Sequence, residues 1–252
     1  MFDTECHALP VSPVVVALLV GVPLALGATL QRTTGLGLAL VGAPFLVAAL
    51  GPRDGVSFGN ALQSVLCTLV LVQTWRETRW SAVGLLLAGA AVGVPLGALV
   101  VATLPEAPLL VVVGLLALVG VGLSVLPAAG AVLRGTSGGL ASGVAAGFVN
   151  ATAGVGGPLV SAYGISQRIE RTAFVPTAQA VLLAVNLSAL LVKGLPDLAG
   201  STWIIGFAAI VVGVLLGGPV SRRLDPVVGR RLMLAVAALG ALATVVRGLV
   251  EL

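Results

Sequence analysis

Ten apolar runs, separated by short polar or glycine-rich loops, make up most of this chain. A helix needs about 20 apolar residues to cross a bilayer, and only helices and closed barrels can satisfy their backbone hydrogen bonds there. The runs lack the alternation of barrel strands and are rich in Gly, Ala, Leu and Val. Only 9% of the residues are charged, whereas soluble domains have about 25%. The sequence therefore predicts an all-α polytopic membrane protein.

The apolar runs fall into two groups of five. We expect the first group at about 13–30, 36–50, 56–74, 81–104 and 108–126. We expect the second group at about 138–152, 155–165, 173–192, 202–220 and 232–250. The connecting segments include a turn at 51–55 and loops at 193–201 and 221–231. No Lys or Arg precedes the first run, so we interpret it as a retained helix and not as a secretory signal.

One apolar region, Gly147–Gly164, is unusually rich in helix-breaking residues. It reads GFVNATAGVGGPLVSAYG, and glycine and proline both disfavour a continuous helix. Broken backbone at membrane depth occurs only where it is buried in protein or lines a cavity. The alternative is an ordinary loop between two hydrophobic helices.

The two halves of the chain share a sequence pattern. Residues 31–37 (QRTTGLG) and 150–156 (NATAGVG) both read amide, any residue, Thr, any residue, Gly, aliphatic, Gly. Two further pairs match in the same order along the chain: Gln63 with Gln179, and Gly93 with Gly213. The three offsets are 119, 116 and 120 residues. We therefore predict an internal duplication, with one transmembrane repeat at 13–127 and a second at 137–250.

The distribution of basic residues predicts the orientation in the membrane. If the runs alternate across the bilayer and the N-terminus is outside, ten Lys and Arg residues face the cytoplasm and three face outward. The three are Arg53, Lys193 and Arg247. This bias follows the positive-inside rule. Because each half has five segments, an odd number, the second half crosses the membrane in the opposite direction to the first. Such inverted repeats with broken or re-entrant helices near the midplane are typical of secondary transporters.

The two interruptions are the candidate binding site. A broken helix exposes backbone N–H groups and a partial positive charge, which suit an anion. The expected substrate-binding residues are Gln31, Arg32, Thr33, Gly35 and Gly37 at the first interruption, and Asn150, Thr152, Gly154, Gly156 and Gly157 at the second. For Arg32, which is charged, the alternative is that it extends to the interface or only sets topology.

Polar residues inside two further runs extend the candidate site. Asn60 and Gln63 lie on one helical face with Cys67, and Gln179 shares a face with Asn186. The match between Gln63 and Gln179 across the repeat favours a site-lining role for Asn60, Gln63 and Gln179. The alternative is that these amides only bond neighbouring helices.

No Asp or Glu lies within the predicted runs, and the single histidine, His7, is in the N-terminal tail. A carboxylate for binding a cation or relaying protons is therefore missing. No metal-binding or catalytic motif occurs, so we expect no enzyme activity, metal or cofactor. The basic residues are spread over short loops, which gives no indication of nucleic-acid binding.

Small residues recur every four positions, as at Gly89, Gly93 and Gly97, and at Gly139, Gly143 and Gly147. Such spacing lets membrane helices approach closely. We therefore interpret these glycines as packing positions, with sliding surfaces as the alternative.

Over nearly its whole length the chain resembles the sulfite exporter TauE/SafE family of membrane transporters. The resemblance depends on two related halves with a glycine-rich element after the first helix of each, at 33–37 with Pro44 further on, and at 150–158. The second element is the closer match, since the first has Gly37-Leu38-Ala39 where the family has more consecutive glycines.

The resemblance implies movement of sulfur-containing anions such as sulfite or organosulfonates. We expect a secondary transporter of a small anion, working by alternating access as a multi-pass protein of the cell membrane. The partners are then the anionic substrate and the lipid bilayer, and the oligomeric state stays open. The alternatives are an anion channel of the same fold and a non-transporting accessory protein.

Overall fold

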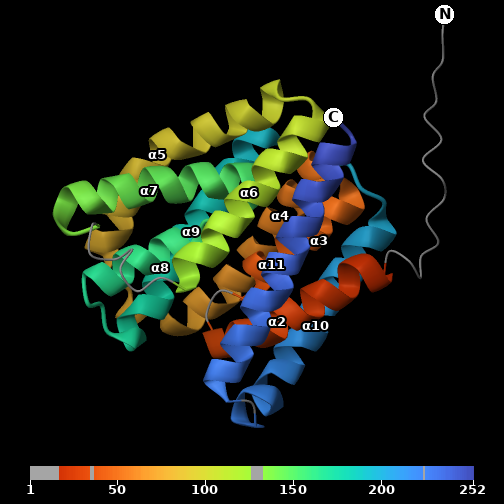
Figure 1. Ribbon diagram of the computed structural model, residues 1–252. Helices are drawn as coiled ribbons and strands as arrows, with labels where there is room; N and C mark the ends of the chain where they lie inside the picture. The colour runs from red at the N-terminus through yellow and green to blue at the C-terminus, as the bar shows by residue number, and fades with distance from the viewer. Residues whose placement is uncertain (1–16, 35–36, 126–132, 224) are drawn as a thin grey trace, which may run out of the picture.

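The computed structural model describes residues 17–34, 37–125, 133–223 and 225–252 (Figure 1). Within these residues all regular secondary structure is helical, beginning with a short π-helical turn, η1 (Ala17–Gly21). The first half then contains α2 (Val22–Thr34), α3 (Gly37–Leu50), α4 (Pro52–Thr74), the 3₁₀ turn η2 (Trp75–Glu77), α5 (Trp80–Thr103) and α6 (Glu106–Val125). The second half contains α7 (Gly135–Ala153), α8 (Gly157–Ser166), α9 (Arg171–Lys193), α10 (Gly200–Arg223) and α11 (Pro226–Val250).

Several helices are longer than the apolar runs that predicted them. The expected turn at 51–55 is wrong beyond Gly51, because α4 already begins at Pro52. The expected loop at 221–231 is mostly helical: α11 begins at Pro226, and the Asp225 side chain accepts a hydrogen bond from the Val227 amide at 2.7 Å. Proline at the first helical position and a capping aspartate are ordinary helix starts. Lys193, expected in a loop, is the last residue of α9.

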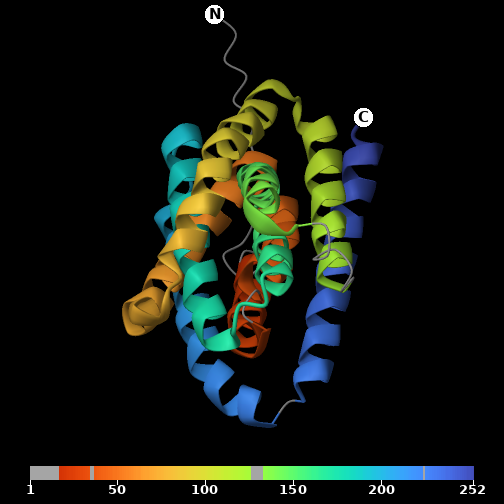
Figure 2. The same cartoon turned by 90° about the vertical axis from the view of Figure 1, so that its left-hand side faces the viewer.

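The helices form three layers, which Figure 2 shows edge-on. The helices of the two interrupted segments, α2, α3, α7 and α8, lie in the middle layer. On one side are α4, α5, α9 and α10, and on the other are α6 and α11. The two interrupted segments, α2–α3 and α7–α8, are therefore enclosed by longer helices.

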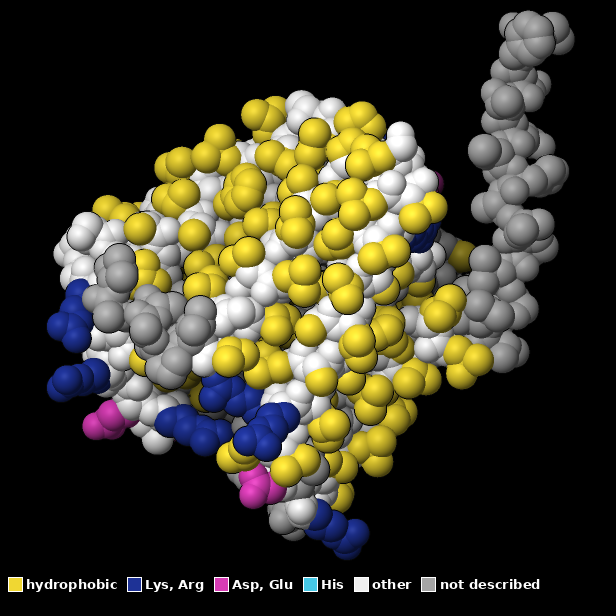
Figure 3. Space-filling model, in the orientation of Figure 1, with side chains coloured by type: hydrophobic (Ala, Val, Ile, Leu, Met, Phe, Trp, Pro, Cys, Tyr) yellow, Lys and Arg dark blue, Asp and Glu magenta, His cyan; other side chains and the backbone are white. Residues whose placement is uncertain are grey.

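The long helices have the dimensions of membrane spans. Within the described residues six helices are long and apolar enough to cross a bilayer, namely α4, α5, α6, α9, α10 and α11. At about 1.5 Å per residue, α3 and α8 extend only about 21 and 15 Å, short of the roughly 30 Å of a hydrocarbon core. Large apolar side chains such as Leu191 and Leu239 point outward. On the face in Figure 3, hydrophobic side chains dominate and most of the visible Lys and Arg side chains lie along the lower left edge. The protein is a multi-pass membrane protein.

Glycines set the closest helix contacts. On α5, a Cβ at Gly93 would lie 2.0 Å from the Val144 carbonyl oxygen of α7, and one at Gly89 would lie 2.2 Å from that of Leu140. On α10, a Cβ at Gly213 would lie 2.5 Å from the Ala25 carbonyl oxygen of α2. The packing role predicted for Gly89 and Gly93 is confirmed.

The helix pairs of the two halves correspond. The five helices of each half can be matched in chain order, which pairs α2 with α7 and α5 with α10. The contact between α5 and α7 then corresponds to the contact between α10 and α2. Both pairs are in close contact. This correspondence is expected for a duplicated fold. The inverted relation of the halves and the repeat bounds 13–127 and 137–250 stay predictions.

Candidate functional site

The first interruption separates α2 from α3 and folds the chain back on itself. A Cβ at Gly37 would lie 2.5 Å from both the Gln31 amide nitrogen and the Gly27 carbonyl oxygen. Only glycine allows this approach. The Gln31 side chain bridges the interruption, since its Oε1 accepts a hydrogen bond from the Leu38 amide at 2.9 Å. Gln31 therefore caps the N-terminus of α3.

The second interruption has a left-handed turn. Gly154 has φ 74° and ends α7, with its amide donating to the Asn150 carbonyl oxygen at 2.9 Å. This is a common way for a helix to end. The Asn150 Oδ1 atom accepts a hydrogen bond from the Gly156 amide at 3.2 Å. Pro158 then occupies the first turn of α8.

The two interruptions share one hydrogen-bonding pattern. In the shared motif the first residue is an amide, Gln31 or Asn150, and in each case its oxygen accepts from a backbone N–H just beyond the break. The two amides differ in the contacts of their nitrogen atoms. The Asn150 Nδ2 donates to Asn186 Oδ1 at 2.7 Å. Among the described residues the buried Gln31 Nε2 has no partner.

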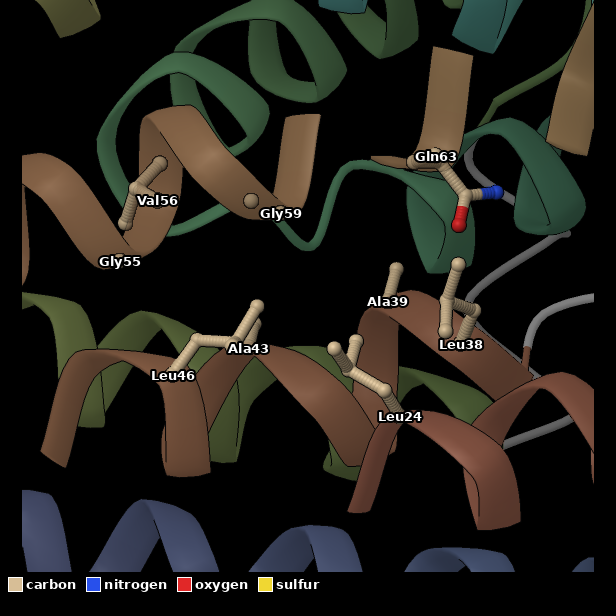
Figure 4. Close-up of a pocket in the computed structure, with 10 residues that line it drawn as sticks. Leu24, Leu38, Ala39, Ala43, Leu46, Gly55, Val56, Gly59 and Gln63 are labelled. Carbon is tan, nitrogen blue, oxygen red and sulfur yellow. The ribbon is translucent and has the colours of Figure 1, made fainter. Parts of the chain in front are cut away.

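Both interruptions border one cavity between α3 and α4. The cavity is about 10 Å³, close to the space that one water molecule needs. Its lining includes Leu38, just after the first interruption, and Gly154, at the second. Figure 4 shows the Gln63 amide pointing from α4 across the cavity toward Leu38. Of the predicted site residues, Gln63 and Gly154 border this cavity, and their role in substrate binding stays a prediction.

The second interruption also contacts Asn60. The position of a Cβ at Gly154 is 3.6 Å from Asn60 Oδ1 and 3.7 Å from the Ala43 Cβ of α3. Asn60 is buried, and among the described residues its Nδ2 has no hydrogen-bond partner. An amide nitrogen without a partner thus belongs to a side chain next to the break.

Unpartnered amide groups are concentrated around these elements. In the described part of the chain the buried side-chain atoms without a partner are Gln31 Nε2, Asn60 Nδ2, Gln63 Oε1, Gln179 Oε1, Asn186 Nδ2 and the hydroxyls of Thr78 and Ser161. Leaving a buried polar group unpaired costs about 1–3 kcal/mol. Four of the five amides, all but Gln179, lie at an interruption, at the cavity or against Asn150, so they are candidate contacts for a polar ligand.

Some predicted site residues have other contacts or lie outside the described residues. The Thr152 hydroxyl donates to the Phe148 carbonyl oxygen at 2.8 Å and faces that of Gly97 at 3.4 Å, so it belongs to the α5–α7 contact. Gly157 is buried as the first residue of α8. The side chains of Arg32 and Thr33 and all of Gly35 lie outside the described residues.

Sequence reasoning missed one charged contact. The Lys193 Nζ donates to the Ala151 carbonyl oxygen, 2.8 Å away, in the last turn of α7. Lys193 is seven residues beyond Asn186, and residues at this spacing share a helical face. That spacing could have placed Lys193 on the same face as Asn186, although it does not predict the contact with Ala151.

Replacing Gly154 with alanine is expected to destabilise the protein by about 1–2 kcal/mol, because an alanine in the left-handed conformation is strained. The space around the position is sufficient, since the nearest atom is 3.6 Å from the added Cβ. Gly154→Asn should lose less stability than Gly154→Ala, since asparagine tolerates the left-handed conformation better. Thermal unfolding in detergent measures both. Gly122→Ala, which meets no atom within 4 Å, is the control, and an equal loss there would contradict the explanation.

Comparison with known proteins decides the family. The model of the sulfite exporter TauE/SafE family matches residues 17–245, which is most of the chain. The chain belongs to this family. It is a TauE/SafE membrane transporter, as its sequence resemblance implied. Neither the curated proteins nor the solved structures contained a match to the chain.

Proposed function

We propose that this TauE/SafE protein is a secondary transporter of a small sulfur-containing anion, with sulfite as the first candidate, in the cell membrane. Alternating access would come from movement of the two interrupted segments. The single observation that carries the proposal is the convergence of both interruptions on one cavity beside buried, unpartnered amides.

The chemistry of the site favours an anion. The N-terminal ends of α3 and α8 begin at the interruptions, and helix N-termini attract negative charge. The unpartnered Gln31 Nε2 and Asn60 Nδ2 atoms are neutral donors at the interruptions. Within the described residues the acidic side chains of the long helices lie in their end turns, as with Asp54 and Glu106. A negative interior potential would favour export of an anion by about 2.3 kcal/mol per charge per 100 mV.

The closed cavity favours a carrier over a channel. A sulfite ion has four heavy atoms, whereas the cavity has room for about one water molecule. Binding therefore requires α3 and α4 to separate, and transport then needs a conformational cycle. The capped breaks at Gln31 and Asn150 are natural hinge points for that motion.

The substrate is tested by an uptake screen in proteoliposomes. Purified protein should accelerate uptake of sulfite, and less strongly of thiosulfate, sulfate, sulfonates or small carboxylates, in a saturable way and under an inside-positive potential. Protein-free liposomes are the control. The proposal is refuted if the protein takes up none of these anions faster than the control. Single-channel conductance would show that the protein is an anion channel and not a carrier.

The proposed orientation places the α9–α10 loop outside and the α8–α9 loop in the cytoplasm. In a variant without Cys6 and Cys67, a cysteine at Asp197 should react with an impermeant maleimide in whole cells. A cysteine at Arg168 should react only after the cells are opened. Both native side chains are exposed. The reverse labelling pattern would show that the N-terminus is inside.

A further inference from the structure

One face of α9 carries polar residues along much of its length. Gln179, Asn186 and Lys193 follow one another at intervals of seven residues and so share a helical face. Gln179 and Asn186 are 2% and 1% exposed, and each has an amide atom without a partner among the described residues. Leaving such atoms unpaired is costly in a span that is otherwise apolar.

This face meets the end of α7 at two consecutive residues. Asn186 bonds to the Asn150 side chain at 2.7 Å, and Lys193 bonds to the Ala151 carbonyl oxygen at 2.8 Å. The interruption at Gly154 follows within one turn. A positive charge thus lies within a turn of the break that carries the second half of the candidate site.

A purely structural role for Lys193 has a close parallel in the chain. The Arg247 guanidinium donates to the Ala48 carbonyl oxygen in the last turn of α3, and cations at helix C-termini are a common stabilising cap. Arg247 also forms a salt bridge with the Glu251 carboxylate at 2.7 Å, and the residues that share its face at intervals of seven, Gly240 and Met233, have no polar side chain. The two caps therefore differ in what lies beside them.

We propose that Lys193 is the cationic contact for the transported anion, at the end of a polar face formed with Gln179 and Asn186. In the closed conformation the ammonium group is held by the Ala151 carbonyl. When the site opens, the ammonium group exchanges this carbonyl for the anion, and the unpartnered Asn186 Nδ2 donates a hydrogen bond to the anion from the same face. This assignment rests on the proposed function.

The test compares Lys193→Gln, Lys193→Arg and the matched control Arg247→Gln in proteoliposomes and in detergent. Lys193→Gln should raise the KM for sulfite about tenfold or more, whereas Lys193→Arg should stay within about threefold of the wild type. Arg247→Gln should lower the melting temperature and leave the KM within about twofold. If Lys193→Gln lowers the melting temperature but keeps the wild-type KM, Lys193 is only a helix cap and the proposal is wrong.

A binding measurement separates this inference from the proposed function. Sulfite that binds the folded protein should raise its melting temperature with increasing concentration. The wild type and Lys193→Arg should show this rise, and Lys193→Gln should not. If sulfite stabilises the wild type but is not transported, the proposed transport function is refuted and Lys193 remains a candidate anion contact. Equal stabilisation of Lys193→Gln and the wild type would refute the contact even if transport is confirmed.

Discussion

Replacing Gln63 with leucine is expected to lower anion transport about tenfold or more, equivalent to about 1.4 kcal/mol or more of lost transition-state stabilisation. The Gln63 amide points into the cavity between the interruptions, and its Oε1 has no partner among the described residues. Its Nε2 reaches only Cys67 Sγ on the same helix, at 3.6 Å. Because leucine removes an unpaired buried polar atom, the melting temperature should be unchanged or higher.

Gln73→Leu is the matched control for this prediction, because Gln73 lies on the same helix but is exposed and bonds to the Leu69 carbonyl oxygen. It should transport at the wild-type rate. Initial rates of uptake and thermal unfolding of the same preparations measure both effects. Normal transport by Gln63→Leu, or a large loss of stability in it, would remove Gln63 from the site.

Replacing Gly93 with alanine is expected to destabilise the folded protein by roughly 1–3 kcal/mol or more. The added Cβ would lie 2.0 Å from the Val144 carbonyl oxygen. Because this oxygen is a backbone atom, the clash is relieved only if α5 and α7 separate. Since α7 carries the second interruption, separation should also misplace Asn150. The melting temperature and the fraction of monodisperse protein on size exclusion measure the loss.

Gly84→Ala is the control, because Gly84 is also on α5 but a Cβ there meets no atom within 4 Å. It should be neutral or slightly stabilising, as alanine is the better helix former. If Gly93→Ala is as stable as Gly84→Ala, the α5–α7 contact is not as close as described.

The sequence predicted the helices and their interruptions well because both follow from local composition. Apolar runs determine the spans, and the Gly154-to-Pro158 cluster determines a break wherever it lies. Asn60 and Gln63 were predicted to share one helical face, and both are buried on α4. The family resemblance is also confirmed by the match over residues 17–245.

The sequence could not predict contacts between distant segments. The sequence did not predict that Asn150 Nδ2 donates to Asn186 Oδ1 or that the Thr152 hydroxyl donates to the Phe148 carbonyl oxygen. The substrate contacts expected for Asn150 and Thr152 stay predictions. Lys193 was assigned to a loop because charge after an apolar run usually marks the end of a span. Its partner, Ala151, is 42 residues away, and no local pattern encodes that approach.

The most direct test of the central claim is counterflow in proteoliposomes. Vesicles containing the purified protein are loaded with unlabelled sulfite and diluted into a trace of labelled sulfite. A carrier built around the two interruptions should accumulate label transiently above equilibrium, and Gln63→Leu should not, while Gln73→Leu should behave like the wild type. Label that only equilibrates, at a rate independent of internal sulfite, would contradict alternating access at this site.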